Sequence, residues 1–141
     1  MPSRKEFQDL SKLRFKEAKV LYENGLHDGA WYLIGYVVEL ALKARICRIL
    51  DRDYPDKGDV SRVFKTHKHD DLIILAGLEK KFDDACQSNL TLKSNWSTVT
   101  EWSEDFRYKP VGTSEKVKVQ EAIAALEDTT SGVLTWLKKY W

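Results

Sequence analysis

Apolar positions recur every three or four residues along most of the chain, which is the spacing of a single helix face. In residues 4–24, Phe7, Leu10 and Leu13 begin such a series, and Gly25 follows it as a stop signal. The pattern predicts an amphipathic first helix that ends just before Gly25.

The most apolar stretch of the chain, GAWYLIGYVVELALKARICRIL, covers residues 29–50. Its apolar residues lie around most of the circumference of a helix rather than along one stripe. A helix of this kind is central to its bundle, not a surface element. We therefore predict a second, central helix over residues 28–50, although Glu39 and Lys43 lie in its middle.

A loop follows, because Pro55 and Gly58 interrupt the periodic pattern. The third helix is predicted over residues 69–86, where Asp70 and Asp71 in the first turn suit the positive end of the helix dipole.

Two more helices are predicted near the C-terminus. The fourth covers residues 89–108 and ends before Pro110. The last runs from Thr113 or Ser114, either of which is a good N-cap, to the end of the chain, with a kink near Gly132.

No stretch alternates between apolar and polar residues for long enough to predict a strand. The expected fold class is all-α: an antiparallel, up-and-down bundle of four to five helices that forms one domain over residues 1–141.

The balance of charge limits the function classes. The chain has 141 residues and a net charge of +1, from 23 basic and 22 acidic residues. A protein that mainly grips nucleic-acid backbone has a larger positive excess, so any such contact must use a local patch or several chains. The longest uncharged run, GAWYLIGYVV, is shorter than the roughly 20 residues of a membrane span. We expect a soluble, cytoplasmic protein with no membrane contact.

The cysteines give no metal signal, whereas His67 and His69 with Asp70 and Asp71 suggest one weakly. Cys47 and Cys86 show no Cys-x-x-Cys or Cys/His spacing, which indicates small buried thiols in a reducing compartment. His67 and His69 form a His-x-His pair, but a metal site normally needs further ligands in fixed geometry. We expect neither a metal nor a cofactor.

Glu39 and Lys43 are four residues apart in the favourable orientation for a helical ion pair, and Tyr32 and Tyr36 share their stripe. The pair has three interpretations: neutralisation where the helix meets the surface, a binding cleft, or a dimer seam. A buried ion pair rarely gains stability over apolar residues, so its retention in a core needs another reason.

At this point the sequence resembles the HEPN domain, a helical domain named for its occurrence in higher eukaryotes and prokaryotes. The resemblance spans roughly residues 10–110 and is carried by GLHDGAWYLIGYVVELALKARI and HKHDDLIIL. The matching positions are Gly29, Ala30, Glu39, Leu42, Lys43 and Ala44, then His69, Asp70 or Asp71, and Leu72, and finally Arg107 and Tyr108 before Pro110.

The resemblance implies a helical bundle that is often dimeric. Some members of the family are RNA-cleaving toxins paired with nucleotidyltransferase-like antitoxins. Others accompany nucleotidyltransferases and bind nucleotide or RNA without cutting it. By resemblance we therefore expect a homodimer, a nucleotidyltransferase-like partner protein and a nucleotide or RNA ligand.

The ribonuclease branch of the family carries an arginine followed four to six residues later by a histidine, in a late helix. Histidine supplies acid–base catalysis near neutral pH, and arginine stabilises the charge that develops on phosphate. Here Arg107 has no histidine after it, and the one formal match, Arg62 with His67, lies beside the loop before the third helix. This departure favours the branch that does not cleave RNA.

The sequence therefore predicts a binding or regulatory module without catalytic residues, with a cleft for a nucleotide, an RNA end or a partner protein. Lys43 and Arg107 would meet phosphate, the tyrosines would stack on a base, and Glu39 would orient Lys43. One alternative is a metal-independent endoribonuclease toxin that uses Arg62 and His67; another is a structural dimerisation module. The predicted cleft consists of Tyr32, Tyr36, Glu39, Lys43, His69, Asp70, Arg107 and Tyr108.

Overall fold

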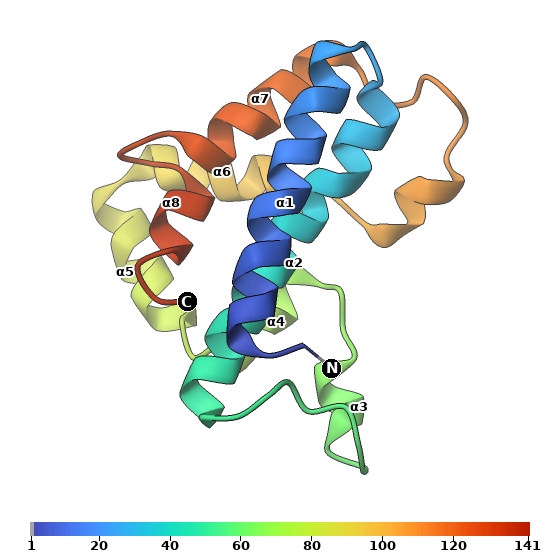
Figure 1. The fold of residues 1–141 in the computed structure, drawn as a ribbon. Coiled ribbons are helices and arrows are strands. Elements are labelled where there is room, and N and C mark those ends of the chain that lie inside the picture. Colours follow the sequence, from blue (N-terminus) through green and yellow to red (C-terminus); the bar gives the residue numbers. More distant parts are fainter. Residues whose placement is uncertain (1) are drawn as a thin grey trace.

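The computed structural model describes residues 2–141, and every regular element in this range is helical (Figure 1). This confirms the predicted all-α class. The elements are α1 (Arg4–Glu23), α2 (His27–Leu50), α3 (Ser61–Phe64), α4 (His69–Leu75), α5 (Glu79–Ser88), α6 (Leu90–Thr100), the 3-10 helix η1 (Glu104–Tyr108), α7 (Lys116–Glu127) and α8 (Val133–Leu137).

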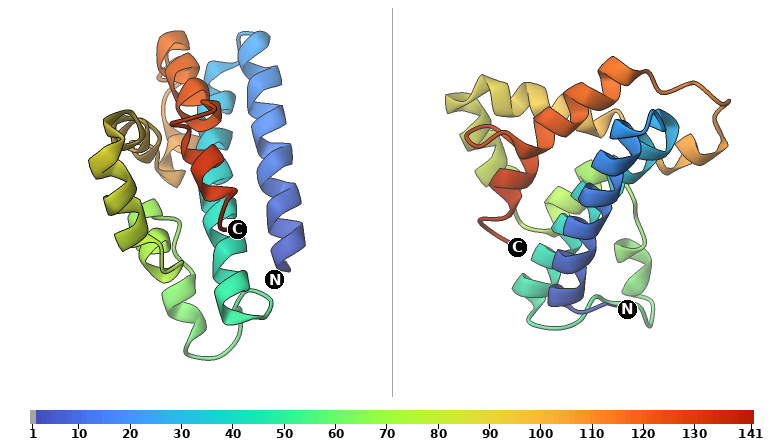
Figure 2. Two further views of the ribbon diagram at one scale, coloured as in Figure 1. Left: turned by 90° about the vertical axis from the view of Figure 1, so that its left-hand side faces the viewer. Right: turned by 45° about the horizontal axis from the view of Figure 1, so that its top comes forward.

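Helices α1 and α2 form an antiparallel pair that lies side by side in every view (Figures 1 and 2). Ser3 begins α1 with a capping box, in which its side chain and that of Glu6 each accept a hydrogen bond from the other residue's backbone. Gly25 adopts a positive φ of 76° in the turn, which a residue without a Cβ tolerates without strain. The fully buried Ser11 hydroxyl donates to the carbonyl oxygen of Val37 over 2.8 Å and joins the two helices.

Helix α2 is central, as its apolar pattern predicts, because it contacts α1, α4, α6, α7, α8 and η1. In the left view of Figure 2, α1 and α5 lie on opposite sides of α2. Trp31, Ile34, Leu42 and Ile46 of α2 are completely buried. None of the helices in residues 2–141 is both long and apolar enough to cross a lipid bilayer.

The predicted third helix, residues 69–86, is divided into α4 and α5. Gly77 lies between them with a φ of 66°, and the backbone N–H of Leu78 donates to the carbonyl oxygen of Ile73. A left-handed glycine followed by such a bond is a common helix stop. The helical spacing of apolar residues continues on both sides of Gly77, so the sequence pattern predicted one helix instead of two.

The predicted fourth helix is also shorter than expected. Helix α6 ends at Thr100, and the chain turns so that Trp102 is buried, with 6% of its surface exposed, before η1 begins. The Ser103 side chain accepts a hydrogen bond from the backbone N–H of Asp105 and caps η1.

The last predicted helix begins later and is broken. Helix α7 starts at Lys116 rather than at Thr113 or Ser114. The backbone N–H of Ser114 instead donates to the carboxylate of Asp28, which ties this segment to the start of α2. The expected kink near Gly132 is a complete break, where the Asp128 carboxylate accepts backbone hydrogen bonds from the segment before α8.

Both cysteines are buried and free, as predicted. Burial raises the pKa of the Cys47 thiol to about 11, so this thiol is protonated and inert at neutral pH.

The indole of Trp102 lies directly on the backbone of α2 at Gly35. A Cβ at Gly35 would lie 1.8 Å from Cδ2 of Trp102, far inside van der Waals contact. The indole N–H donates to the carbonyl oxygen of Tyr32 over 2.9 Å, and the ring of His69 stacks on the indole at 5.5 Å between centroids. The missing side chain at Gly35 therefore allows α4, α6 and η1 to approach α2.

We expect Gly35→Ala to lower the free energy of unfolding by roughly 3 kcal/mol, the upper part of the range for overpacked cores, because the indole must move as a whole. Urea unfolding followed by circular dichroism measures this change. Gly29→Ala is the matched control on the same helix, since its Cβ would meet only a terminal methyl of Leu21 at 3.3 Å. An equal loss in both variants would contradict the proposed close approach.

Candidate functional site

The ion pair of Glu39 and Lys43 in the middle of α2 is buried, and both residues come from the same chain. Glu39 is 2% exposed and Lys43 7% exposed. The Lys43 ammonium donates to Oε1 of Glu39 over 2.7 Å. A third group joins them from the segment before α4: Nδ1 of His67 lies 2.9 Å from the same oxygen. Because a carboxylate only accepts, His67 carries its proton on Nδ1, and Nε2 remains available to another partner.

The other carboxylate oxygen of Glu39, Oε2, is buried and has no hydrogen-bond partner among the described side chains. Leaving a buried charged oxygen without a partner costs free energy, because it loses water and gains nothing in return. The lysine also keeps donors beyond the one that it gives to Glu39. Glu39 and Lys43 therefore do pair with each other, but they do so in a buried position rather than where the helix meets the surface.

A cavity of about 320 Å³ opens beside Lys43 and His67. Tyr54 forms part of its wall, and its hydroxyl donates to the carbonyl oxygen of Phe64 over 2.8 Å. The Lys43 ammonium lies 5.3 Å from the centre of the Tyr54 ring, within the range of a cation–π contact. Burial and the charge of Glu39 raise the pKa of Tyr54, so its hydroxyl stays protonated and can donate. The wall consists of Lys43, Tyr54, Pro55, Asp56, Phe64, Lys65 and His67.

The tyrosine pair lies further towards the N-terminal end of α2, on the same stripe. The hydroxyls of Tyr32 and Tyr36 are 3.3 Å apart, and their rings meet edge to face with centroids 5.3 Å apart. Burial, followed by the hydrogen bond with Tyr32, raises the pKa of Tyr36, so the Tyr36 phenol is neutral at physiological pH.

Arg107 and Tyr108 of η1 extend this surface. Hydrogen bonding with the side chains of Tyr32 and Tyr108 raises the pKa of Arg107, which places its guanidinium beside the tyrosine pair. The guanidinium carbon lies 4.8 Å from the centre of the Tyr108 ring, and 76% of Tyr108 is exposed. An exposed arginine and tyrosine in contact offer a flat, cationic stacking surface.

His69 is a supporting residue and does not line the cavity. It is 4% exposed, and its Nε2 donates to the carbonyl oxygen of Gly35 over 2.9 Å. Burial lowers its pKa, so the ring is neutral.

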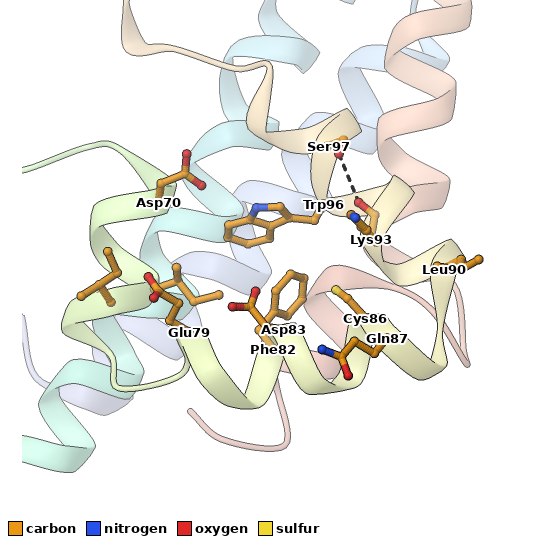
Figure 3. Close-up of a pocket in the computed structure, with 12 residues that line it drawn as sticks. Asp70, Glu79, Phe82, Asp83, Cys86, Gln87, Leu90, Lys93, Trp96 and Ser97 are labelled. Atoms are coloured by element: carbon orange, nitrogen blue, oxygen red, sulfur yellow. Dashed lines mark hydrogen bonds between the residues drawn. The ribbon is translucent and has the colours of Figure 1, made fainter.

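Asp70, the next residue, is exposed and lines a different groove, between α4, α5 and α6 (Figure 3). Of the eight predicted cleft residues, only Lys43 lines the cavity, Glu39 is joined to it by the ion pair, and Asp70 lines the other groove.

Five residues of the cavity wall were not predicted: Tyr54, Pro55, Asp56, Phe64 and Lys65. They lie in or beside the loop between α2 and α4, where no periodic pattern marks an inward position. The only sequence signal nearby was the Arg62–His67 spacing. In the structure, Arg62 is exposed, lies 4.0 Å from Asp59 and is not part of the cavity wall, whereas His67 is.

Comparison with known protein families adds to this geometry. The family model for the HEPN domain matches residues 9–140, nearly the whole chain. The chain belongs to the HEPN family. HEPN domains are associated with nucleotide or RNA binding or with ribonuclease activity, and they often dimerise. The match also extends the sequence resemblance, which covered residues 10–110, to the C-terminal helices.

Neither the curated proteins nor the solved structures that were compared gave a match to this HEPN chain. Within residues 2–141, no group of three or more His, Cys, Asp or Glu side chains is arranged to hold a metal ion.

We expect Lys43→Met to lower the free energy of unfolding by roughly 3–5 kcal/mol, because it leaves the buried Glu39 carboxylate without its main partner. The double variant Glu39→Met/Lys43→Met should recover most of this loss, since well-packed apolar residues replace a buried ion pair at little or no cost. Urea unfolding at one pH measures both variants. A double variant as unstable as the single one would show that the pair itself stabilises the fold.

The buried, neutral His69 makes stability depend on pH. Its pKa is lowered from 6.5 in the folded state, so below pH 6.5 the unfolded chain binds more protons than the folded one. The contribution of His69 to the free energy of unfolding should therefore be constant above pH 7 and fall as the pH drops through 6.5. His69→Gln keeps an N–H donor for Gly35 and does not titrate, so this variant should lose that part of the decline. Identical pH profiles for the two proteins would exclude His69 as the cause.

Proposed function

We propose that this HEPN domain is a binding module that holds a short single-stranded stretch of RNA along the polar stripe of α2, without cutting it. The buried Glu39–Lys43 pair carries this proposal. An unpaired carboxylate oxygen and a lysine with spare donors, at the edge of a cavity, are unfavourable for folding alone. Such a site has a function if Lys43 binds a phosphate and Glu39 holds the Lys43 side chain in position.

The order of groups along the stripe supports a strand rather than a single nucleotide. Arg107 lies at one end, the two tyrosines follow, and Lys43 with Lys65 lies at the other end. From Tyr32 to Lys43 the helix rises roughly 16 Å at 1.5 Å per residue. This is the length of about five stacked nucleotides at roughly 3.4 Å each. Aromatic rings between two cationic ends are typical of surfaces that bind single strands without sequence preference.

The small net charge of +1 predicts weak binding by one chain, so we propose that the module works as a homodimer. A nucleotidyltransferase-like protein is the proposed partner, on the basis of the family resemblance.

A second candidate function is metal-independent RNA cleavage, favoured by one observation. The buried Glu39 holds His67 through Nδ1 and leaves Nε2 free to transfer a proton, which is the arrangement of an oriented general base. The sequence-based partner for this chemistry is the exposed Arg62 of α3, which lies 4.0 Å from Asp59 in the turn before that helix.

Fluorescence anisotropy with a labelled eight-nucleotide oligouridine tests the binding proposal. Arg107→Gln and Lys65→Gln should each weaken binding and reduce the slope of log affinity against log salt by about 0.7, the value for one lost contact to a single strand. Lys80→Gln is the matched control, because it removes the same charge from a lysine of α5 that pairs with Asp84.

Equal effects of all three substitutions would show attraction by net charge alone, and no binding at low salt would contradict the proposal. The stripe would then remain a candidate dimer interface, which sedimentation of Glu39→Met/Lys43→Met would test.

Incubation with total RNA in EDTA separates binding from cleavage. We expect the RNA to stay intact with the unmodified protein. Cleavage that is lost in either His67→Ala or Arg62→Ala would instead establish the ribonuclease function.

A further inference from the structure

A larger hollow lies away from the polar stripe, between α4, α5 and α6 (Figure 3). Its volume is about 650 Å³, within the range of roughly 300–1,000 Å³ that is usual for small-molecule sites. Its wall consists of Asp70, Ile73, Ile74, Glu79, Phe82, Asp83, Cys86, Gln87, Leu90, Lys93, Trp96 and Ser97.

The floor of this groove is apolar and aromatic. The rings of Phe82 and Trp96 meet with centroids 4.9 Å apart. Ile73 and Cys86 complete the floor and are 5% and 7% exposed. Burial raises the pKa of the Cys86 thiol, which therefore adds no charge to the floor. A ligand that rests here needs an apolar body, and the aromatic faces can also attract a cation.

The rim of the groove is acidic. Figure 3 shows the carboxylates of Asp70, Glu79 and Asp83 around the two aromatic rings. None of these three side chains has an ion pair or hydrogen bond within residues 2–141. Their neighbour Asp84, outside the groove, is paired with Lys80 over 3.2 Å.

The groove therefore carries a negative charge that the protein itself does not balance. Three carboxylates and one ammonium, that of Lys93, give the wall a formal charge of −2, although the whole chain has a charge of +1. Like charges gathered around an apolar floor repel one another, and a cationic ligand would relieve this repulsion.

We propose that this groove binds a small organic polycation with an aliphatic body, such as a linear polyamine. The methylene chain would pack on Ile73, Phe82 and Trp96, while its ammonium groups would meet the unpaired carboxylates at the rim. An inorganic cation would leave the aromatic floor unused, and a neutral apolar molecule would leave the carboxylates unpaired. This site shares no residue with the proposed RNA surface, so the two proposals stand or fall separately.

Calorimetric titration of the full chain with spermidine, at pH 7.5 and 150 mM salt, tests the proposal. We expect saturable binding of one molecule per chain. Glu79→Gln/Asp83→Asn should weaken it at least tenfold, because it removes two rim charges and keeps the shape of the side chains. Lys93→Gln should strengthen it severalfold, since it removes the only cation of the wall.

Asp84→Asn is the matched control, because it removes a charge from the same helix outside the groove and should leave the affinity unchanged. The four substituted residues, Glu79, Asp83, Asp84 and Lys93, are all exposed. Thermal melts would establish that each variant is folded.

Four outcomes would overturn the proposal. They are no heat with spermidine, an unchanged affinity in the double variant, an equal loss in Asp84→Asn, or equal binding of the neutral analogue 1,8-octanediol. Binding of a lysine-rich peptide without binding of spermidine would likewise assign the groove to a protein partner instead.

Discussion

The close contact between the Trp102 indole and the α2 backbone at Gly35 governs the arrangement of both candidate surfaces. Only glycine leaves room for the ring, and two hydrogen bonds fix the contact: Trp102 donates to Tyr32, and His69 donates to Gly35. Because both acceptors are carbonyl oxygens of one helix, α4 and the end of α6 are held in register with α2. The position of His67, and hence of the cavity beside Lys43, follows from this contact, since His67 lies two residues before His69.

Aromatic rings connect the two surfaces. From the polar stripe, Tyr36 contacts Trp102, Trp102 stacks on His69, and His69 contacts Trp96, which forms part of the floor of the acidic groove. A close-packed row of large rings has little freedom to adjust at one point alone. The row gives a physical path between the surfaces, although coupling between two sites exists only where both bias a common element.

The Glu39–Lys43–His67 cluster has a different character from the rest of the core. The buried side chains of Ser11 and His69 have hydrogen-bond partners in α2, whereas Nδ1 of His27 and Nε1 of Trp31 are buried without one. Glu39 instead offers one oxygen to two donors and leaves the other without a partner. Of the three buried side-chain nitrogen and oxygen atoms in residues 2–141 that have no hydrogen-bond partner, Glu39 Oε2 is the one that belongs to a carboxylate. Its carboxylate is paired with Lys43, which lines the cavity, and this favours function rather than packing as the reason for these residues.

The sequence by itself determined the helical class, the central position of α2 and the family. These depend on local periodicity and on short motifs such as the residues around Glu39 and Lys43, which a chain carries whatever its fold. It also gave the pairing of those two residues, because a spacing of four on a helix fixes their contact.

Tertiary structure decided the rest: the stop at Gly77, the turn that buries Trp102, and the entry of His67, Tyr54 and Lys65 into one cavity. It also moved Asp70 from the predicted cleft to the acidic groove, although His69 beside it points to α2. A loop has no repeating face, and consecutive helical residues point in directions about 100° apart, so only the packing of the helices establishes what each side chain meets.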